Sequence, residues 1–127
     1  INLIFKNKGE NYFRKIERVT TILELKKNNS VISLGGGAFI NNTIRKKTKK
    51  LSTSFWLDVP VEELIKRLKR NKQRPLLFKR NAHETIKRIY FERKKIYNEA
   101  DHRIKCNSLR SNEIVNIILS LYEKSGD

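Results

Sequence analysis

Apolar residues recur along this chain with the spacing of short helices and strands that alternate. Residues 12–27 repeat apolar side chains every three or four positions, which predicts an amphipathic helix. The polar run Asn28-Asn29-Ser30 ends this helix, and the β-branched run after it predicts a buried strand over residues 31–34. Similar patterns predict strands over residues 54–58 and 102–106, and helices over residues 60–71, over residues 83–99 and from residue 111 onward.

Polar residues and prolines set the expected helix ends. Asp58 is predicted to cap the next helix, and Pro60 fits its first turn, where the missing N–H costs nothing. Arg74 precedes Pro75 and resists helical conformation, so this helix is expected to end before it. Ser111 is predicted to cap the last helix. Strands that alternate with helices at this spacing are typical of a layered α/β fold with a parallel sheet.

Three consecutive glycines, Gly35, Gly36 and Gly37, follow the first predicted strand directly. Glycine lacks a Cβ, so the backbone can approach a neighbouring group closely. In open α/β sheets, ligands bind beyond the carboxyl ends of the strands. The three glycines therefore indicate either a backbone surface for a ligand or a flexible or bulged connection, and these residues alone leave both open.

The charge balance leaves the partner open. The 127 residues hold 29 Lys and Arg against 13 Asp and Glu, a formal net charge of +16. These charges are spread along the chain, and the densest run, residues 45–50, is interpreted as a solvated helix face or loop. An anionic small molecule accounts for the positive charge as well as a nucleic acid does.

Length and cysteine content narrow the class of protein. A chain of 127 residues forms one domain at most, with a modest core. Cys106 is the single cysteine, which predicts a small buried hydrophobe in a reducing compartment, the cytoplasm. No apolar run approaches the length of a membrane span, so no membrane partner is expected. The chain has no methionine and begins at Ile1 within an apolar pattern, so we expect it to be a piece of a longer protein.

Four motifs follow one another along the chain. They are Gly9-Glu10-x-x-Phe13-Arg14-x-x-Glu17, the predicted strand with Gly35-Gly36-Gly37, Arg74-Pro75-Leu76-Leu77, and Arg93-x-x-x-Tyr97-x-Glu99-Ala100-Asp101. In this order they resemble the shikimate kinases, a group of P-loop kinases related to the nucleoside-monophosphate kinases. The resemblance covers nearly the whole chain.

The resemblance implies a three-layer α/β/α fold with a parallel sheet in the strand order 2-3-1-4-5. The strands near residues 31, 54 and 102 would be the third, fourth and fifth, so the first two strands would be absent from this chain. Residues 1–127 would then form a single shikimate kinase domain that is incomplete at its N-terminus. The implied activity is transfer of the γ-phosphoryl group of ATP to the 3-hydroxyl of shikimate, a step toward chorismate and the aromatic amino acids.

The resemblance also implies which residues bind shikimate. Arg14 and Arg93 match arginines that bind the shikimate carboxylate, a group that a planar guanidinium suits. Gly35, Gly36 and Gly37 match a loop whose backbone lies against the shikimate ring and its hydroxyls. Glu17 lies three residues after Arg14 in a predicted helix, so it is expected to orient Arg14 through a side-chain pair. The alternative for both arginines is a surface ion pair.

Two further arginines match the nucleotide side of the family. Arg74 matches a lid arginine that closes over the phosphates, and Arg67 matches an arginine that flanks the adenine ring. The alternatives are an ordinary loop cation for Arg74 and a solvated helix face for Arg67.

The largest departure from the family is an absence in the sequence. The 127 residues contain no Gly-x-x-x-x-Gly-Lys-Ser/Thr phosphate loop and no Asp-x-Asp motif. The phosphate loop and the ligands of Mg²⁺ are therefore expected upstream of Ile1, no metal ligand is expected in this chain, and these residues alone are expected to be inactive. The complete protein is expected to bind shikimate and ATP as a monomer in the cytoplasm.

Two other functions remain as alternatives. A basic nucleic-acid-binding module would interleave aromatic and basic side chains on one surface, whereas the aromatic residues here follow the spacing of a core. The second alternative is another small-molecule P-loop kinase, such as a gluconate kinase, but two carboxylate-directed arginines that flank the three glycines favour shikimate over it. The resemblance therefore favours shikimate as the partner over a nucleic acid.

Overall fold

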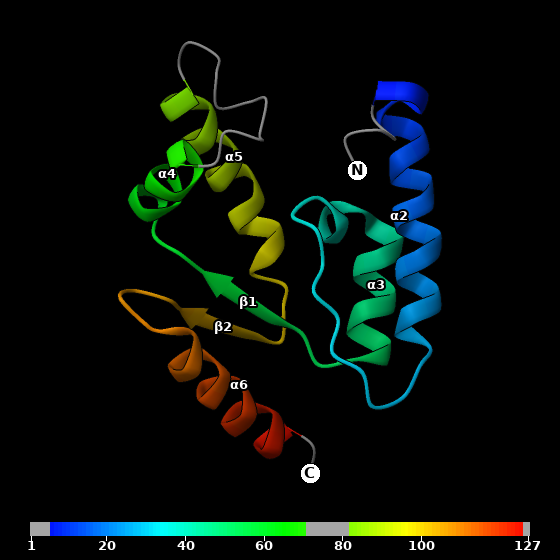
Figure 1. Cartoon of the computed structure of the whole chain (residues 1–127). Coiled ribbons are helices and arrows are strands. Elements are labelled where there is room, and N and C mark those ends of the chain that lie inside the picture. The colour runs from blue at the N-terminus through cyan, green and yellow to red at the C-terminus, as the bar shows by residue number, and fades with distance from the viewer. Residues whose placement is uncertain (1–5, 71–81, 126–127) are drawn as a thin grey trace. The chain divides into compact units, whose positions relative to one another are not determined.

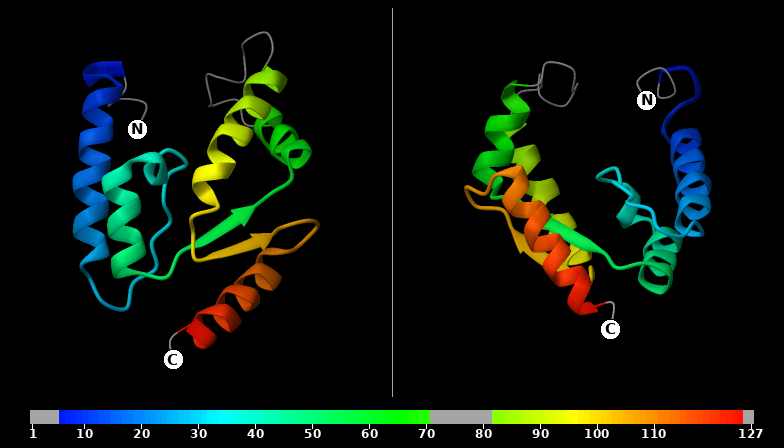
Figure 2. Two further views of the ribbon diagram at one scale, coloured as in Figure 1. Left: turned by 180° about the vertical axis from the view of Figure 1, so that it is seen from behind. Right: turned by 60° about the horizontal axis from the view of Figure 1, so that its bottom comes forward.

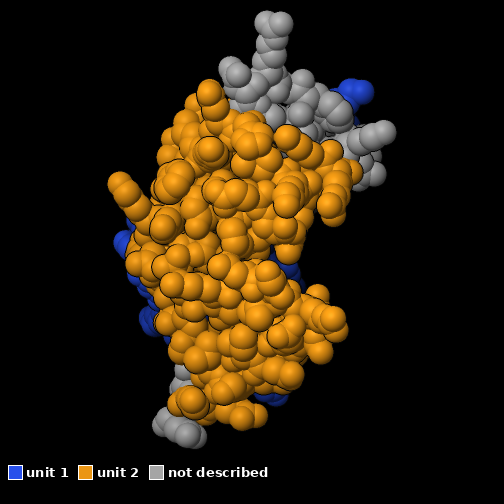
Figure 3. Space-filling view, turned by 90° about the vertical axis from the view of Figure 1, so that its left-hand side faces the viewer, with its two compact units in different colours: residues 1–54 blue, residues 55–127 orange. Residues whose placement is uncertain are grey.

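The computed structural model describes residues 6–70 and 82–125, which fall into two compact units. Unit 1 is residues 1–54 and unit 2 is residues 55–127, as coloured in Figure 3. Unit 1 contains the helix α2 (Glu10–Leu25), the 3-10 helix η1 (Ala38–Ile40) and the helix α3 (Asn42–Leu51). Unit 2 contains β1 (Phe55–Asp58), α4 (Val61–Arg70), α5 (Ala82–Tyr97), β2 (His102–Lys105) and α6 (Ser111–Ser125).

In unit 1, α2 and α3 lie side by side and run in the same direction (Figures 1 and 2). The connecting segment, residues 26–37, therefore returns along the pair before η1 begins. Leu25 from α2, Phe39 from η1 and Ile44 from α3 are all buried. These apolar side chains form the core of the unit, and the core holds η1 and the glycines before it close to α2.

The basic run after the glycines is a helix with one buried face. Asn41 caps α3, because its Oδ1 accepts a hydrogen bond from the backbone N–H of Ile44 at 3.1 Å. Ile44 and Thr48, four residues apart, are both buried, and Leu51 ends the helix. The interpretation of residues 45–50 as a solvated helix face is therefore confirmed, since the four lysines of α3 are exposed and Thr48 lies on its buried face. The cap and the i, i+4 spacing are the sequence signals that indicate the helix.

Arg45 ties α3 to η1. Its Nη1 donates hydrogen bonds to the carbonyl oxygens of Phe39, at 3.0 Å, and of Ile40, at 3.1 Å. Its Nη2 donates to Oδ1 of Asn42 at 3.2 Å. These carbonyls lie at the end of η1, and the Arg45 guanidinium supplies a donor to each of them.

The prediction of a strand over residues 31–34 is wrong for the described structure. This segment has no strand assignment, and the side chain of Val31 is fully exposed. A strand requires a neighbour that accepts and donates along its edge. Among the described residues, β1 and β2 pair only with each other, so residues 31–34 have no such neighbour.

Unit 2 is built on a parallel pair of strands, as predicted. Phe55 lies opposite His102 and Trp56 opposite Arg103, so side chains alternate between the two faces of the sheet. The helix α5 covers the face that carries Trp56, whose ring contacts Tyr97 at a centroid distance of 6.1 Å. Figure 2 shows α5 and α6 on opposite sides of the strands. The arrangement of helix, sheet and helix is that of a layered α/β fold.

The other predicted elements of unit 2 are present, with ends within one or two residues of the expected ones. The helices over residues 60–71 and 83–99 are confirmed as α4 and α5, and the last helix is confirmed as α6. Ser111 is the first residue of α6 rather than its cap. The capping contact instead joins the backbone N–H of Arg110 to Oε1 of Glu113 at 3.1 Å, which is one half of a capping box.

Cys106 is buried at the end of β2, as predicted, and its Sγ donates to the carbonyl oxygen of Ile104 at 3.4 Å. Burial is the main cause that raises the pKa of this thiol, and the charge of Asp58 adds to the effect. Within the described ranges, none of the helices combines the length and the apolar character that crossing a membrane requires.

Candidate functional site

Arg14 and Glu17 form an ion pair on α2. Nη1 of Arg14 donates to Oε1 of Glu17 at 2.8 Å, and Nε of Arg14 lies 3.7 Å from Oε1 of Glu10. The side chain of Glu17 is only 13% exposed, whereas that of Arg14 is 36% exposed. Glu17 therefore holds one edge of the guanidinium from a nearly buried position, and Arg14 keeps a surface that solvent reaches.

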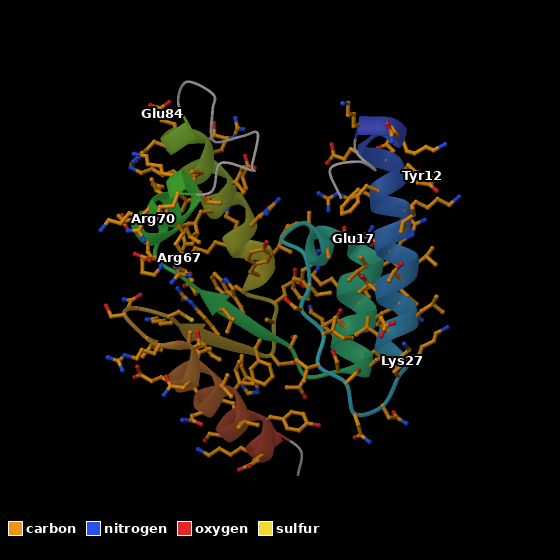
Figure 4. All side chains as sticks on the ribbon, in the orientation of Figure 1. Tyr12, Glu17, Lys27, Arg67, Arg70 and Glu84 are labelled. Carbon is orange, nitrogen blue, oxygen red and sulfur yellow. The ribbon has the colours of Figure 1, made fainter. Side chains whose placement is uncertain are left out.

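This pair packs against the backbone of the glycine segment, and Figure 4 labels Glu17 beside the loop that leads into η1. A Cβ on Gly37 would lie 2.5 Å from Nη1 and 2.7 Å from Nη2 of Arg14. A Cβ on Gly35 would lie 3.2 Å from Oε2 of Glu17. A side chain at position 37 would therefore displace the Arg14 guanidinium, and one at position 35 would press on Glu17 more mildly. The glycine segment is thus in close contact with the ion pair.

Within unit 1, the structure thus brings together three of the predicted features: Arg14, Glu17 and the glycine segment. The guanidinium lies directly beside bare main chain, with Phe13 at 5.3 Å from its carbon to the ring centroid. A fixed cation next to exposed backbone is suited to a small anion that also makes polar contacts with the main chain.

Arg93 lies on α5 in unit 2 and is half-buried. It follows Tyr90 by three residues and precedes Tyr97 by four, so all three share one face of the helix. Tyr90 and Tyr97 both contact β1 from this face. Among the described residues of its own unit, no carboxylate forms an ion pair with Arg93.

Of the two arginines predicted to contact the nucleotide, Arg67 and Arg74, the structure describes only Arg67. Arg67 lies on α4, where Figure 4 labels it, and its Nε donates to Oε1 of Glu63 at 3.0 Å. Both side chains of this i, i+4 pair are exposed, which matches the alternative of a solvated helix face. Arg74 lies outside the described residues.

A buried cluster in unit 2 escaped the sequence patterns. Asp58, predicted as a helix cap, is 6% exposed and accepts a hydrogen bond from the hydroxyl of Tyr90 at 2.9 Å on Oδ1. Its Oδ2 accepts from Nε of Arg103 at 2.9 Å and also from Nη2. The guanidinium carbon of Arg103 lies 4.8 Å from the centroid of the Trp56 ring. The prediction that Asp58 caps α4 is wrong, because α4 begins at Val61 and the carbonyl oxygen of Pro60 accepts its first hydrogen bond, from Leu64.

The same cluster changes the acidity of Tyr90. Burial, the hydrogen bond to Asp58 and the negative charge of Asp58 together raise the pKa of the Tyr90 hydroxyl, in that order of size. The hydroxyl therefore stays protonated and continues to donate to Asp58 throughout the physiological pH range.

A surface cavity of about 610 Å³ lies along α5, but no predicted site residue lines it. Its walls include Arg88, Phe91, Lys94 and Arg103. Arg88 and Arg103 already pair with carboxylates, so we do not place the site there. In the part of the chain that the structure describes, no group of three or more His, Cys, Asp or Glu side chains is arranged to hold a metal ion.

Comparison with known proteins gives a consistent result. The sequence model of the shikimate kinase family matches residues 1–123 of this chain. A shikimate kinase of Persephonella marina is 42% identical over 116 residues, which cover 91% of this chain and 70% of that protein. A shikimate kinase of Aquifex aeolicus is 41% identical over 118 residues, which cover 93% of this chain and 69% of that protein.

Solved structures agree with the sequence relatives. A shikimate kinase from Acinetobacter baumannii, in complex with shikimate, superimposes with a TM-score of 0.88 at 28% identity and covers 97% of this chain and 69% of that one. The shikimate kinase structure from Aquifex aeolicus superimposes with a TM-score of 0.80 at 36% identity and covers 98% of this chain and 73% of that one.

Proposed function

This chain belongs to the shikimate kinase family, and from this premise we propose that it supplies the shikimate-binding side of an ATP-dependent phosphorylation of the shikimate 3-hydroxyl. Arg14 and Arg93 bind the carboxylate, and Gly35, Gly36 and Gly37 lie against the ring and its hydroxyls. The observation that carries the proposal is the contact between the Arg14 guanidinium and the bare backbone at Gly37. A carboxylate bound to Arg14 must lie beside that backbone.

The Arg14–Glu17 pair prepares the site before the substrate arrives. Glu17 fixes the guanidinium through one N–H group, and the ordering of a long side chain is then completed during folding. A prepared guanidinium loses less side-chain entropy on binding, so more of the charge-assisted interaction appears as affinity. Arg93 carries no competing ion pair among the described residues of unit 2, which leaves its charge available for the same carboxylate.

Only two residues of this chain are proposed to contact ATP. ATP is the phosphoryl donor, and Mg²⁺ neutralises charge on the phosphates when it is bound. The described residues offer no metal-binding group of acidic side chains, and the sequence has no phosphate loop, so we derive no step through Mg²⁺ from this chain. Arg74 and Arg67 remain the proposed contacts to the nucleotide.

The two alternative functions, a nucleic-acid-binding module and another small-molecule kinase, have less support. A module that binds nucleic acids does not follow from membership of this family, and its charges here are spread over several helices. A different small-molecule kinase is not favoured, because the matching family model and the relatives reported above are those of shikimate kinases.

The proposal is tested in the complete gene product that contains this sequence, by steady-state kinetics with shikimate and ATP. Arg93→Ala is expected to raise KM for shikimate by about 10- to 100-fold, because a charge-assisted contact to the carboxylate is lost. The matched control is Arg88→Ala, which removes an exposed arginine from the same helix and should leave KM within about twofold. An unchanged KM in Arg93→Ala contradicts the proposed clamp.

A further inference from the structure

The cluster around Asp58 attaches α5 to the sheet close to Arg93. Asp58 ends β1 and receives the Tyr90 hydroxyl from α5 at 2.9 Å, 32 residues later in the chain. Arg103 from β2 holds the other carboxylate oxygen from the neighbouring strand. The carboxylate therefore joins three elements, and Tyr90 is the contact through which it holds α5.

Arg93 lies between the two points at which α5 touches β1. Tyr90 is three residues before it, and Tyr97, whose ring contacts Trp56 at 6.1 Å, is four residues after it. Residues with this spacing lie on one face of a helix, one turn above another. The rotation of α5 about its axis is consequently set one turn before and one turn after Arg93.

We propose that Tyr90 and Asp58 are positioning residues for Arg93, which fix the rotation of α5 and thereby the direction in which the Arg93 guanidinium points. This inference rests on the proposed function of Arg93 as a carboxylate contact. A displacement of about 1 Å at a binding group costs up to about 100-fold in rate or affinity. A single hydrogen bond in the middle of α5 is therefore able to control binding by Arg93, one turn further along the helix.

Arg103 fixes the orientation of the Asp58 carboxylate. With Oδ2 held by Arg103, only Oδ1 faces Tyr90, so the tyrosine has one acceptor in one direction. The guanidinium of Arg103 is in turn held against the Trp56 ring. Arg103 therefore cannot turn without breaking a contact to Asp58 or to Trp56.

The test is a double-mutant cycle in the complete gene product, read as KM for shikimate, KM for ATP and kcat. Tyr90→Phe removes only the hydroxyl and is expected to raise KM for shikimate about fivefold, with KM for ATP and kcat within about twofold of the parent. In an Arg93→Ala background, Tyr90→Phe should cause no further rise, because it acts through Arg93. Tyr122→Phe, which removes an exposed hydroxyl from α6, is the control and should change nothing.

A second variant separates positioning from a general loss of structure. Asp58→Asn still accepts a hydrogen bond from Tyr90 but loses its charge, so it should raise KM for shikimate in the same direction and combine non-additively with Tyr90→Phe. A Tyr90→Phe enzyme with unchanged KM, or one whose effect persists in full beside Arg93→Ala, overturns the inference. If Arg93→Ala itself has no effect, the proposed function fails first, so the two failures are distinguishable.

Discussion

Two arginine–carboxylate pairs in this protein have the same chemistry and different surroundings. Arg14–Glu17 in unit 1 joins residues three apart on one helix, at 2.8 Å. Arg103–Asp58 in unit 2 joins two strands across 45 residues of sequence. Both arginine side chains are 36% exposed, so exposure of the cation does not distinguish them.

The difference lies in how many donors and faces of the guanidinium are already occupied. Arg103 gives both Nε and Nη2 to one buried oxygen and covers one face with Trp56. Arg14 gives Nη1 to Glu17 and borders bare main chain at Gly37. An arginine whose donors and ring-facing side are occupied, such as Arg103, stabilises the fold. An arginine with one donor bound and glycine backbone beside it, such as Arg14, keeps N–H donors for a ligand.

The largest effect is expected from removal of the buried carboxylate. Asp58→Ala should lower the free energy of unfolding by about 3 kcal/mol, because the loss leaves Arg103 and the Tyr90 hydroxyl without their acceptor. Urea denaturation of the complete gene product measures this. The control, Glu63→Ala, removes an exposed carboxylate that pairs with Arg67 at 3.0 Å and should cost no more than about 0.5 kcal/mol. Equal losses in both variants would remove the distinction between buried and exposed pairs.

Removal of Arg14, the arginine of the pair in unit 1, should weaken shikimate binding rather than lower the stability of the fold. Arg14→Ala is expected to raise KM for shikimate by about 10- to 100-fold, with a change in unfolding free energy below about 1 kcal/mol. Arg14→Lys keeps the charge but not the planar fork, so its KM should fall between those of the parent and Arg14→Ala. Kinetics and urea denaturation of the same preparations decide the point, and a large stability loss with normal KM would contradict it.

The glycine segment offers a graded test of the same site. Gly37→Ala places a Cβ 2.5 Å from the Arg14 guanidinium, which is the end of a flexible side chain and will move. We expect KM for shikimate to rise about tenfold with little change in the melting temperature. Gly35→Ala belongs to the same proposed site but places its Cβ at the milder distance of 3.2 Å from Glu17, so it should raise KM for shikimate less than Gly37→Ala does. A larger effect at Gly35 than at Gly37 would contradict the assignment of Arg14.

The smallest effect concerns alkaline pH. The pKa of Tyr90 is raised in the folded protein, so above pH about 10 the unfolded chain loses this proton while the folded protein retains it. The unfolded state then binds fewer protons, and stability falls as pH rises from that point. Urea midpoints between pH 9 and pH 11 should fall less steeply in Tyr90→Phe than in the parent. Identical slopes would show that Tyr90 does not titrate with folding.

The local elements and the family could be predicted from the residues alone. The 3.6-residue period of α2, α4 and α5 is a property of neighbouring residues, and it predicts the helices. The four motifs in their order carry the resemblance to the shikimate kinases, and the match to the family model confirms it. The pairing of Arg14 with Glu17 was accessible for the same reason, because residues three apart on a helix are neighbours. Cys106 was correctly expected to be buried.

Contacts between distant residues were decided only by the tertiary structure. Asp58 carries the sequence signals of a helix cap, yet partners 32 and 45 residues away bind its carboxylate. Residues 31–34 carry the composition of a strand, but a strand exists only where a partner offers hydrogen bonds. Periodicity reports which face of an element is apolar, and it contains no information on which other element will cover that face. That choice depends on packing and on the satisfaction of buried polar groups, which arise only when the whole chain is folded.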